Sequence, residues 1–338
     1  VGWNGRPIIL RSRSGTRIDL RSTQLTTPVR AGSWKHLFTR ASRACPKRNS
    51  RAIMTEFEQA EQSDFDQIAA LHKNAALLPF SYLQETVYTI VLITLSITVV
   101  HLTTLKTYQI CRSHTKGYSH ATAWKVTYQF TNLVVNLVLG MLGIYHYTHT
   151  IPRQASGTER VSGWEELGIF GAMQIGYQLW ALPVGFFFVN ETPTMLAHHL
   201  QVIIVGALGT FFTNGFRYVT PFFFGVIEIS SVPLSIMNHF KANPDLINSY
   251  PGLYTFIRVF FMIVFLTVRV IMWLPNMYSF LHDCGILCYT CDNLMCNAGL
   301  GVSFLAAVGL TFLQLMWAYI ILQGFVKLLT GGKNKKTV

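Results

Sequence analysis

Charged residues are scarce in this chain, and the long runs without them exclude an ordinary soluble domain. Only 12% of the 338 residues are Asp, Glu, Lys or Arg, whereas soluble globular proteins carry about 25%. A helix needs about 20 consecutive apolar residues to cross a bilayer. Four runs of about that length contain no charged residue at all: 86–105, 126–147, 167–189 and 298–326.

Three further runs complete the membrane-spanning pattern. Residues 200–216 are uncharged but short, while 218–238 and 259–281 each carry one charged residue, Glu228 and Arg269 respectively. Because lipid offers no water to the backbone amides, each spanning run must be helical. The sequence therefore predicts an all-α membrane protein with about seven transmembrane helices.

The net charge of +12 is concentrated at the N-terminal end. Residues 1–53 hold twelve Lys and Arg against one acidic residue, and the rest of the chain holds fifteen basic and fourteen acidic residues. This Ser- and Thr-rich basic arm has an organelle-targeting composition, so it is either a leader or a retained arm. It has too little apolar surface to order by itself. We expect it to contact other membrane-protein subunits or anionic headgroups rather than nucleic acid.

Composition divides the remaining chain into three parts. Residues 54–82 are acidic and have helical spacing, which predicts an amphipathic helix at the membrane surface or a solvated linker helix. The transmembrane domain covers 83–327, and a basic tail covers 328–338.

Lysine and arginine residues near the spans predict the orientation. Ten lie on the side that carries the C-terminus and the start of the fourth span, and four lie on the other side. The C-terminal side is therefore expected to face the cytosol or the matrix. Lys335 and Lys336 stand where a dilysine ER-retrieval signal would. The basic arm favours the mitochondrial inner membrane instead, with the ER membrane as the alternative.

Four of the six cysteines cluster between the last two spans, as Cys284, Cys288, Cys291 and Cys296. Their spacing suits disulfides, structural thiols, or a metal or iron–sulfur site. The loop is expected on the lumenal or intermembrane side, where thiols oxidise, and no cofactor-binding domain surrounds it. Disulfides are therefore favoured over a metal.

Two charged residues lie deep inside predicted spans. Glu228 is central in "FFFGVIEISSVPLSI", and Arg269 is central in "RVFFMIVFLTVRVIMWLP". Charges at such depth cost several kcal/mol unless they face protein or water. They form either a buried ion pair that braces two helices or the polar floor of a lipid cavity.

The order of three segments resembles the TLC (TRAM–Lag homology) family, which includes the ceramide synthases and smaller lipid-associated membrane proteins. The segments are "GYQLWALPVGFFFVNETPTMLAHHLQVIIVGAL" (176–208), "GVIEISSVPLSI" (225–236) and "FIRVFFMIVFLTVRVIMWLP" (256–275). The resemblance covers about 84–327. It implies a bundle of helices that encloses a lipid cavity.

The resemblance also implies which residues are polar inside that cavity. In ceramide synthases the family's histidines lie where an acyl chain is activated, and a neutral imidazole can act there as a base or nucleophile. If the chain is an enzyme, His198, His199 and Glu228 are its catalytic candidates. The polar cavity residues implied are these three together with Arg269 and Tyr177.

The rest of the cavity is expected to be apolar. Phenylalanines and glycines from 171–188 and 206–224 are predicted to line it, with His198 or His199 at its polar end. The expected occupant is a phospholipid or another acyl lipid, and no other cofactor is expected.

The chain departs from the ceramide synthases in its carboxylates. Residues 208–228 contain no Asp or His, and Ala181 stands where many smaller members have Asp. A carboxylate normally holds and tunes a histidine base, and only Glu191 and Glu228 remain for that role. The resemblance is therefore to the smaller, non-synthase branch.

Two functions follow as expectations. The first is a non-catalytic lipid-binding protein that serves as an accessory subunit of a larger mitochondrial membrane complex. The alternative is an ER acyl-lipid enzyme, or a regulator of membrane lipid composition.

Overall fold

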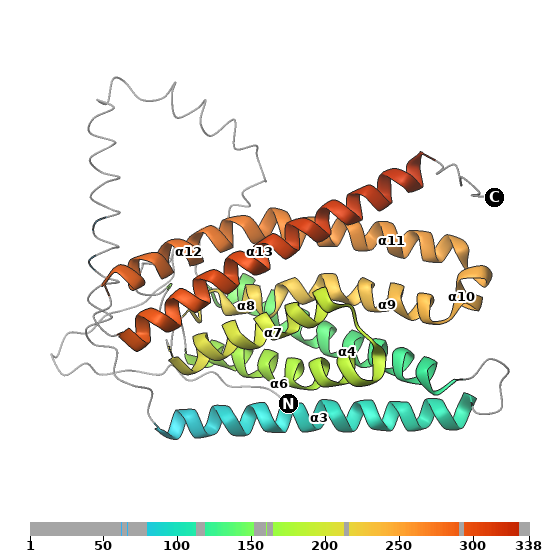
Figure 1. The fold of residues 1–338 in the computed structure, drawn as a ribbon, viewed down its shortest axis with the longest axis horizontal. Helices are drawn as coiled ribbons and strands as arrows, with labels where there is room; N and C mark the ends of the chain where they lie inside the picture. Colours follow the sequence, from blue (N-terminus) through green and yellow to red (C-terminus); the bar gives the residue numbers. More distant parts are fainter. Residues whose placement is uncertain are drawn as a thin grey trace, which may run out of the picture. The chain divides into compact units, whose positions relative to one another are not determined.

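The computed structural model describes residues 80–112, 119–151, 160, 165–212, 216–290 and 294–330, together with Gln62 and Asp66. The helices belong to one compact unit that begins at Glu58. Within the described residues every regular element is helical and no strand occurs, as predicted (Figure 1). The arm 1–53, most of the segment 54–82 and the tail from residue 331 lie outside the described residues, so the expectations about them stay predictions.

Seven helical segments in the described part of the chain are long and apolar enough to cross a membrane, which confirms the predicted number. The main helices are α3 (Phe80–Arg112), α4 (His120–His149), α6 (Ile169–Val184), α7 (Pro193–Ala207), α9 (Ser231–Ala242), α11 (Pro251–Leu266), α12 (Trp273–Thr290) and α13 (Leu294–Leu329).

The fourth span begins earlier than the sequence predicts, at Pro193 instead of residue 200. The Thr192 side chain caps this helix by accepting a hydrogen bond from the Met195 backbone N–H at 3.4 Å. A threonine cap followed by proline at the first helical position is a favoured helix start. The histidine pair consequently lies in the second turn of α7 and not at its entrance.

The fifth span is broken into short pieces: α8 (Thr220–Phe223), the 3₁₀ segment η4 (Val226–Ser230) and α9. A glycine permits the break, because a Cβ atom on Gly143 of α4 would collide with the backbone of Gly225 and Val226. The two backbones therefore meet directly, as only glycine allows. This contact holds Glu228, on η4, against α4 and α6.

In the described part of the chain, three π-helical segments interrupt the spans: η2 (Gly185–Val189), η3 (Leu208–Phe212) and η5 (Thr267–Met272). Single π-helical turns are rare in proteins overall, but where they occur they often lie at functional sites. Here η3 and η5 both line pockets.

The helices pack in a continuous series. α3 packs on α6 and α4, α6 packs on α7, and α4 packs on α9. α13 packs on α12, α7 and α11, and Figure 1 shows α3 and α13 at opposite edges of the view. The helices α4, α6, α7 and α9 meet α11 and α13 around the candidate site, and all six contribute residues to its lining.

Candidate functional site

A pocket of about 490 Å³, here called the polar pocket, lies among α4, α6, α7, α9, α11 and α13. The structure brings together in its lining all five residues that the sequence predicts as polar cavity residues: Tyr177, His198, His199, Glu228 and Arg269. Each of them is less than a tenth exposed. Five polar side chains from four different spans therefore meet at one pocket.

The two histidines are buried side by side on α7. Their ring centroids lie 5.8 Å apart, and the His198 ring meets the edge of Trp317 at 5.4 Å. Nδ1 of His198 and both ring nitrogens of His199 have no hydrogen-bond partner among the described residues. A neutral imidazole offers one donor and one acceptor, and leaving such atoms unsatisfied is costly. The polar pocket therefore presents hydrogen-bonding capacity that the protein does not use itself.

The ion pair expected between the two deep charges is present. Arg269 Nη2 lies 3.5 Å from Glu228 Oε2, and both side chains are almost completely buried. Two further donors reach the carboxylate: Gln174 Nε2 donates to Oε1 at 2.9 Å, and Ser231 Oγ donates to Oε2 at 2.8 Å. Both oxygens of Glu228 are consequently engaged.

Arg269 extends this network across the bundle. Its Nε donates to Ser230 Oγ at 2.6 Å, its Nη2 donates to Ser231 Oγ at 3.0 Å, and its Nη1 donates to Gln314 Oε1 at 3.4 Å. One guanidinium thus ties the fifth, sixth and seventh spans together. Planar guanidinium groups suit this role because they offer five N–H donors in a fixed arrangement.

The described carboxylates do not orient the histidines. Within the part of the chain that the structure describes, no hydrogen bond or ion pair joins either imidazole to Glu191 or Glu228, although all four residues line the polar pocket. Glu191 lies between the third and fourth spans. Burial raises the pKa of its carboxyl above the ordinary value, against opposing contributions from the Thr192 backbone and the Lys125 charge. The arrangement suits hydrogen bonding to a ligand better than general-base catalysis.

Asn132, Asn136 and Gln178 line this pocket and were missed by the sequence predictions, as was Gln174, which donates to the Glu228 carboxylate. Tyr177 donates to Asn132 Oδ1 at 3.0 Å, and Asn136 Nδ2 donates to the Tyr177 hydroxyl at 3.4 Å. Asn132 and Asn136 are four residues apart on α4, and Gln174 and Gln178 are four apart on α6, so each pair shares one helix face. Polar residues inside spans usually face the bundle interior, and that spacing is a signal that could have found them.

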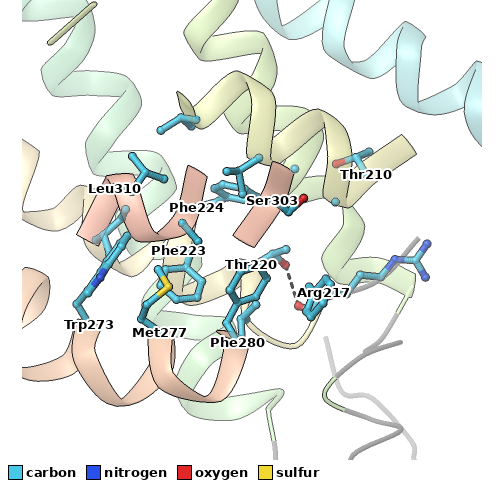
Figure 2. Close-up of a pocket in the computed structure, with 18 of the residues that line it drawn as sticks. Thr210, Arg217, Thr220, Phe223, Phe224, Trp273, Met277, Phe280, Ser303 and Leu310 are labelled. Carbon is cyan, nitrogen blue, oxygen red and sulfur yellow. Dashed lines mark hydrogen bonds between the residues drawn. The ribbon is translucent and has the colours of Figure 1, made fainter. Parts of the chain in front are cut away.

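A second, smaller pocket of about 70 Å³, here called the apolar pocket, adjoins the first. Figure 2 shows the rings of Phe223, Trp273 and Phe280 gathered with Met277 around it, and the Thr220 hydroxyl donating to the Arg217 carbonyl at 2.8 Å. His198 lines both pockets, so the two meet at this side chain.

The predicted lining of the apolar part is right in some places and wrong in others. From the predicted ranges, the residues that line the apolar pocket include Gly171, Gly209, Phe216, Phe223 and Phe224. In contrast, Phe186, Phe187 and Phe188 point away from both pockets and are 58%, 70% and 50% exposed. A phenylalanine that faces lipid and one that faces a cavity both meet an apolar environment, so composition does not separate them.

The cysteine cluster is described only in part. Cys284 is buried on α12, where its thiol donates to the Leu300 carbonyl at 3.6 Å, and Cys288 is half-buried. Cys291 and the side chain of Cys296 lie outside the described residues. Among the described residues, no group of three or more His, Cys, Asp or Glu side chains is placed to hold a metal ion.

Both pockets lie largely within a stretch that matches a known family. Residues 125–323, more than half of the chain, match the family model described as the TLC domain. Comparisons with curated proteins and with solved structures gave no match. The seven candidate spans agree with this family assignment. The chain therefore belongs to the TLC domain family, as a multi-pass membrane protein associated with lipid.

Proposed function

We propose that this protein binds a membrane lipid in the polar pocket and does not act on it chemically. The observation that carries the proposal is the pair of buried histidines on α7. Three of their ring nitrogens lack a hydrogen-bond partner among the described residues, and both rings line a pocket of about 490 Å³. A lipid headgroup or ester would satisfy atoms that otherwise cost free energy.

The charges around the polar pocket favour a lipid without net charge. Its lining contains two acidic side chains, Glu191 and Glu228, and two basic ones, Lys241 and Arg269. Because Glu228 and Arg269 neutralise each other at 3.5 Å, the pocket has no excess charge to attract an anion. A zwitterionic phospholipid or an uncharged acyl lipid fits this balance.

The carboxylates support a binding role over a catalytic one. General-base catalysis by histidine contributes roughly 10²–10⁴-fold and needs a base that is correctly held and tuned. Glu228 is engaged by Arg269, Gln174 and Ser231, and among the residues that the structure describes neither imidazole is bonded to a carboxylate. Acyl transfer is therefore expected to be slow or absent.

The proposal extends to an accessory-subunit role in a larger complex of the mitochondrial inner membrane. It is supported by the basic arm, which places twelve positive charges against one negative charge in residues 1–53. Deleting 1–53 should release the protein from its complex on a blue-native gel without changing the unfolding of the bundle. Unchanged migration would contradict the subunit role.

The alternative is an ER enzyme that transfers acyl chains. The observation that favours it is the same histidine pair, because adjacent imidazoles with unengaged nitrogens are also what a base or nucleophile requires. Transfer of acyl chains from acyl-CoA by the purified protein, abolished by H198Q/H199Q, would establish the enzyme and overturn the binding proposal.

Substitution of the histidine pair tests lipid binding directly. H198Q/H199Q should keep the lipid that copurifies, because glutamine retains a donor and an acceptor. H198L/H199L should lose about tenfold or more in affinity, because two hydrogen bonds of about 1 kcal/mol each disappear. The readout is the molar ratio of lipid to protein by mass spectrometry after purification.

His101 provides a matched control for these variants. It is also a buried histidine, 1% exposed, but it lies on α3 and lines neither pocket. H101L should therefore leave the lipid content unchanged. Equal lipid content in H198L/H199L and the wild type would contradict the proposal.

A further inference from the structure

The polar pocket opens at one end of the bundle, where α9 turns into the short helix α10 (Pro244–Ser249) and then into α11 (Figure 1). The residues of α9 that line the pocket recur at helical intervals on one face, and they are Ser231, Leu234, Ser235, Asn238 and Lys241. Lys241, one residue before the end of α9, both lines the pocket and is exposed. The mouth of the pocket therefore carries a lysine.

The face of α11 that lines the pocket leads to a second basic residue. Phe261 and Phe265 line the polar pocket, and Arg258 lies three residues before Phe261 and so extends the same face towards the end of the bundle. The Arg258 guanidinium lies over the ring of Tyr254 at 5.8 Å, and this ring stacks on Phe240 of α9 at 5.7 Å. Arg258 is thereby held on the side of α11 that faces α9.

The two basic side chains at the mouth have no acidic partner. Arg258 is close enough for its charge to act on Lys241, and like charges repel each other. Within the described residues, neither side chain forms an ion pair, and this includes Asp245 on the neighbouring α10. The ammonium group of Lys241 donates only to an uncharged group, Asn238 Oδ1 at 3.5 Å. This side of the mouth consequently has positive charge that the protein does not neutralise.

The opposite side of the mouth differs in this respect. Glu191, which precedes α7, also lines the polar pocket, and the charge of Lys125 on α4 acts on its carboxyl group. The acidic residue at the mouth therefore has a basic residue of its own. The charges that line the pocket balance, whereas Arg258, just outside the lining, adds an excess on the α9 and α11 side.

An ammonium group beside a guanidinium group suits a phosphate. Both form short charge-assisted hydrogen bonds to phosphate oxygens, the guanidinium with two N–H groups at once and the ammonium as a point charge. In a phospholipid the phosphate is joined through glycerol to the ester groups. With the phosphate at the mouth, the esters extend inward along the pocket that the histidine pair also lines.

We propose that Lys241 and Arg258 bind the phosphate group of a phospholipid at the mouth of the polar pocket, with the ester groups of that lipid towards His198 and His199. This inference rests on the proposed lipid-binding function. Of the two kinds of lipid that suit the pocket, it selects the phospholipid over the uncharged acyl lipid, because only the phospholipid brings an anion to this pair.

The test compares two lipids that differ in the phosphate group. The full chain is purified from vesicles that hold phosphatidylcholine and diacylglycerol with identical acyl chains in equal amounts, and the retained lipids are measured by mass spectrometry. The wild type should favour phosphatidylcholine by about tenfold or more, because hydrogen bonds between charged groups are the stronger kind. K241Q/R258Q should lose this preference and retain diacylglycerol unchanged, whereas K241R/R258K, which keeps both charges, should keep it.

A matched control removes two positive charges from the same end of the bundle. Lys106 and Lys327 are exposed near the C-terminal ends of α3 and α13, and neither lines a pocket. K106Q/K327Q should therefore retain the two lipids in the wild-type ratio. An equal loss of preference in this control would assign the effect to general surface charge and overturn the inference.

The remaining outcomes separate this inference from the proposed function. A wild-type lipid ratio in K241Q/R258Q overturns the phosphate site while lipid binding stands. Inorganic phosphate added in excess should not displace phosphatidylcholine, and displacement would show a site for free phosphate instead of a phospholipid. If the wild type retains neither lipid, the proposed function falls as well.

Discussion

The two adjoining pockets share helices and one histidine, yet different interactions hold them in place. Around the polar pocket, hydrogen bonds of 2.6–3.5 Å made by Arg269 and Glu228 join the third, fifth, sixth and seventh spans. Around the apolar pocket, rings pack on rings, as Phe223 does on Trp273 at 4.9 Å. Inside a bilayer, apolar packing gains no hydrophobic free energy over contact with lipid tails. The stability of the polar region should therefore depend on individual hydrogen-bonding atoms, and the stability of the apolar region on how closely its side chains fit together.

The largest effect is expected from R269M. This substitution replaces the guanidinium group with a shorter, uncharged side chain and leaves Glu228 buried without its positive partner. Breaking a buried ion pair in this way costs about 3–5 kcal/mol. The free energy of unfolding, measured by denaturant titration in detergent micelles, should fall by that amount.

The double variant R269M/E228Q shows whether the loss comes from the unpaired charge. It removes both charges, so much of the stability should return. If the double variant is as unstable as R269M, the ion pair is not what stabilises this region.

A smaller loss is expected in the apolar region from F222A. Phe222 is fully buried and packs on Tyr147 and Phe223. A cavity of roughly 100 Å³ at about 24 cal/mol per Å³ costs about 2 kcal/mol. F187A is the control, because Phe187 is 70% exposed and its removal leaves no cavity. Equal losses in the two variants would refute the view that shape governs this region.

A still smaller loss of stability is expected from Y177F. It removes the hydroxyl that donates to Asn132 and accepts from Asn136, and nothing else. Hydrogen bonds between membrane helices contribute on average about 0.6 kcal/mol, so the loss should be about 1 kcal/mol. In a double-mutant cycle, adding N136A to Y177F should cost less than N136A alone, and strict additivity would contradict the contact.

The smallest effect concerns pH and Glu191. Burial raises the pKa of this carboxyl in the folded state, whereas in the unfolded state the pKa is about 4.3. At any pH between these two pKa values, the folded state binds more protons than the unfolded state. Stability then falls as pH rises through that window. The E191Q variant lacks this titration. The difference between its thermal unfolding midpoint and that of the wild type should therefore shift in favour of E191Q as the pH increases from about 4. A constant difference would contradict the raised pKa.

Much of the fold was predictable because the cost of placing charge in lipid is large. Runs without charge predicted the seven spans, and the two exceptions, Glu228 and Arg269, proved to be partners at 3.5 Å. The bounds of the fourth span were not predicted, because the cap at Thr192 and Pro193 starts the helix ahead of its apolar run.

The rest of the site depends on which way side chains point. The outward Phe186–Phe188 and the inward Phe223 and Phe224 are chemically identical residues in similar contexts. What separates them is the rotation of their helices, which π-helical turns and the break at Gly225 alter locally. Neither the π-helical turns nor the break at Gly225 can be recognised clearly from the amino-acid composition of the spans.

The π-helical segment η5 determines how the sixth span faces its neighbours. In a straight α-helix, every fourth residue drifts by about 40° around the axis, so Phe261 and Met277 would diverge by about 160°. A π-turn contains more residues than an α-turn, so each residue advances by a smaller angle and the drift is reversed over Thr267–Met272. The wider turn therefore offsets the rotation around the helix axis that residues spaced by four would accumulate in a regular α-helix. If Thr267–Met272 were regular α-helix, Trp273 would lie about 120° around the helix axis from Phe261, and the two pockets would no longer share one face of the sixth span.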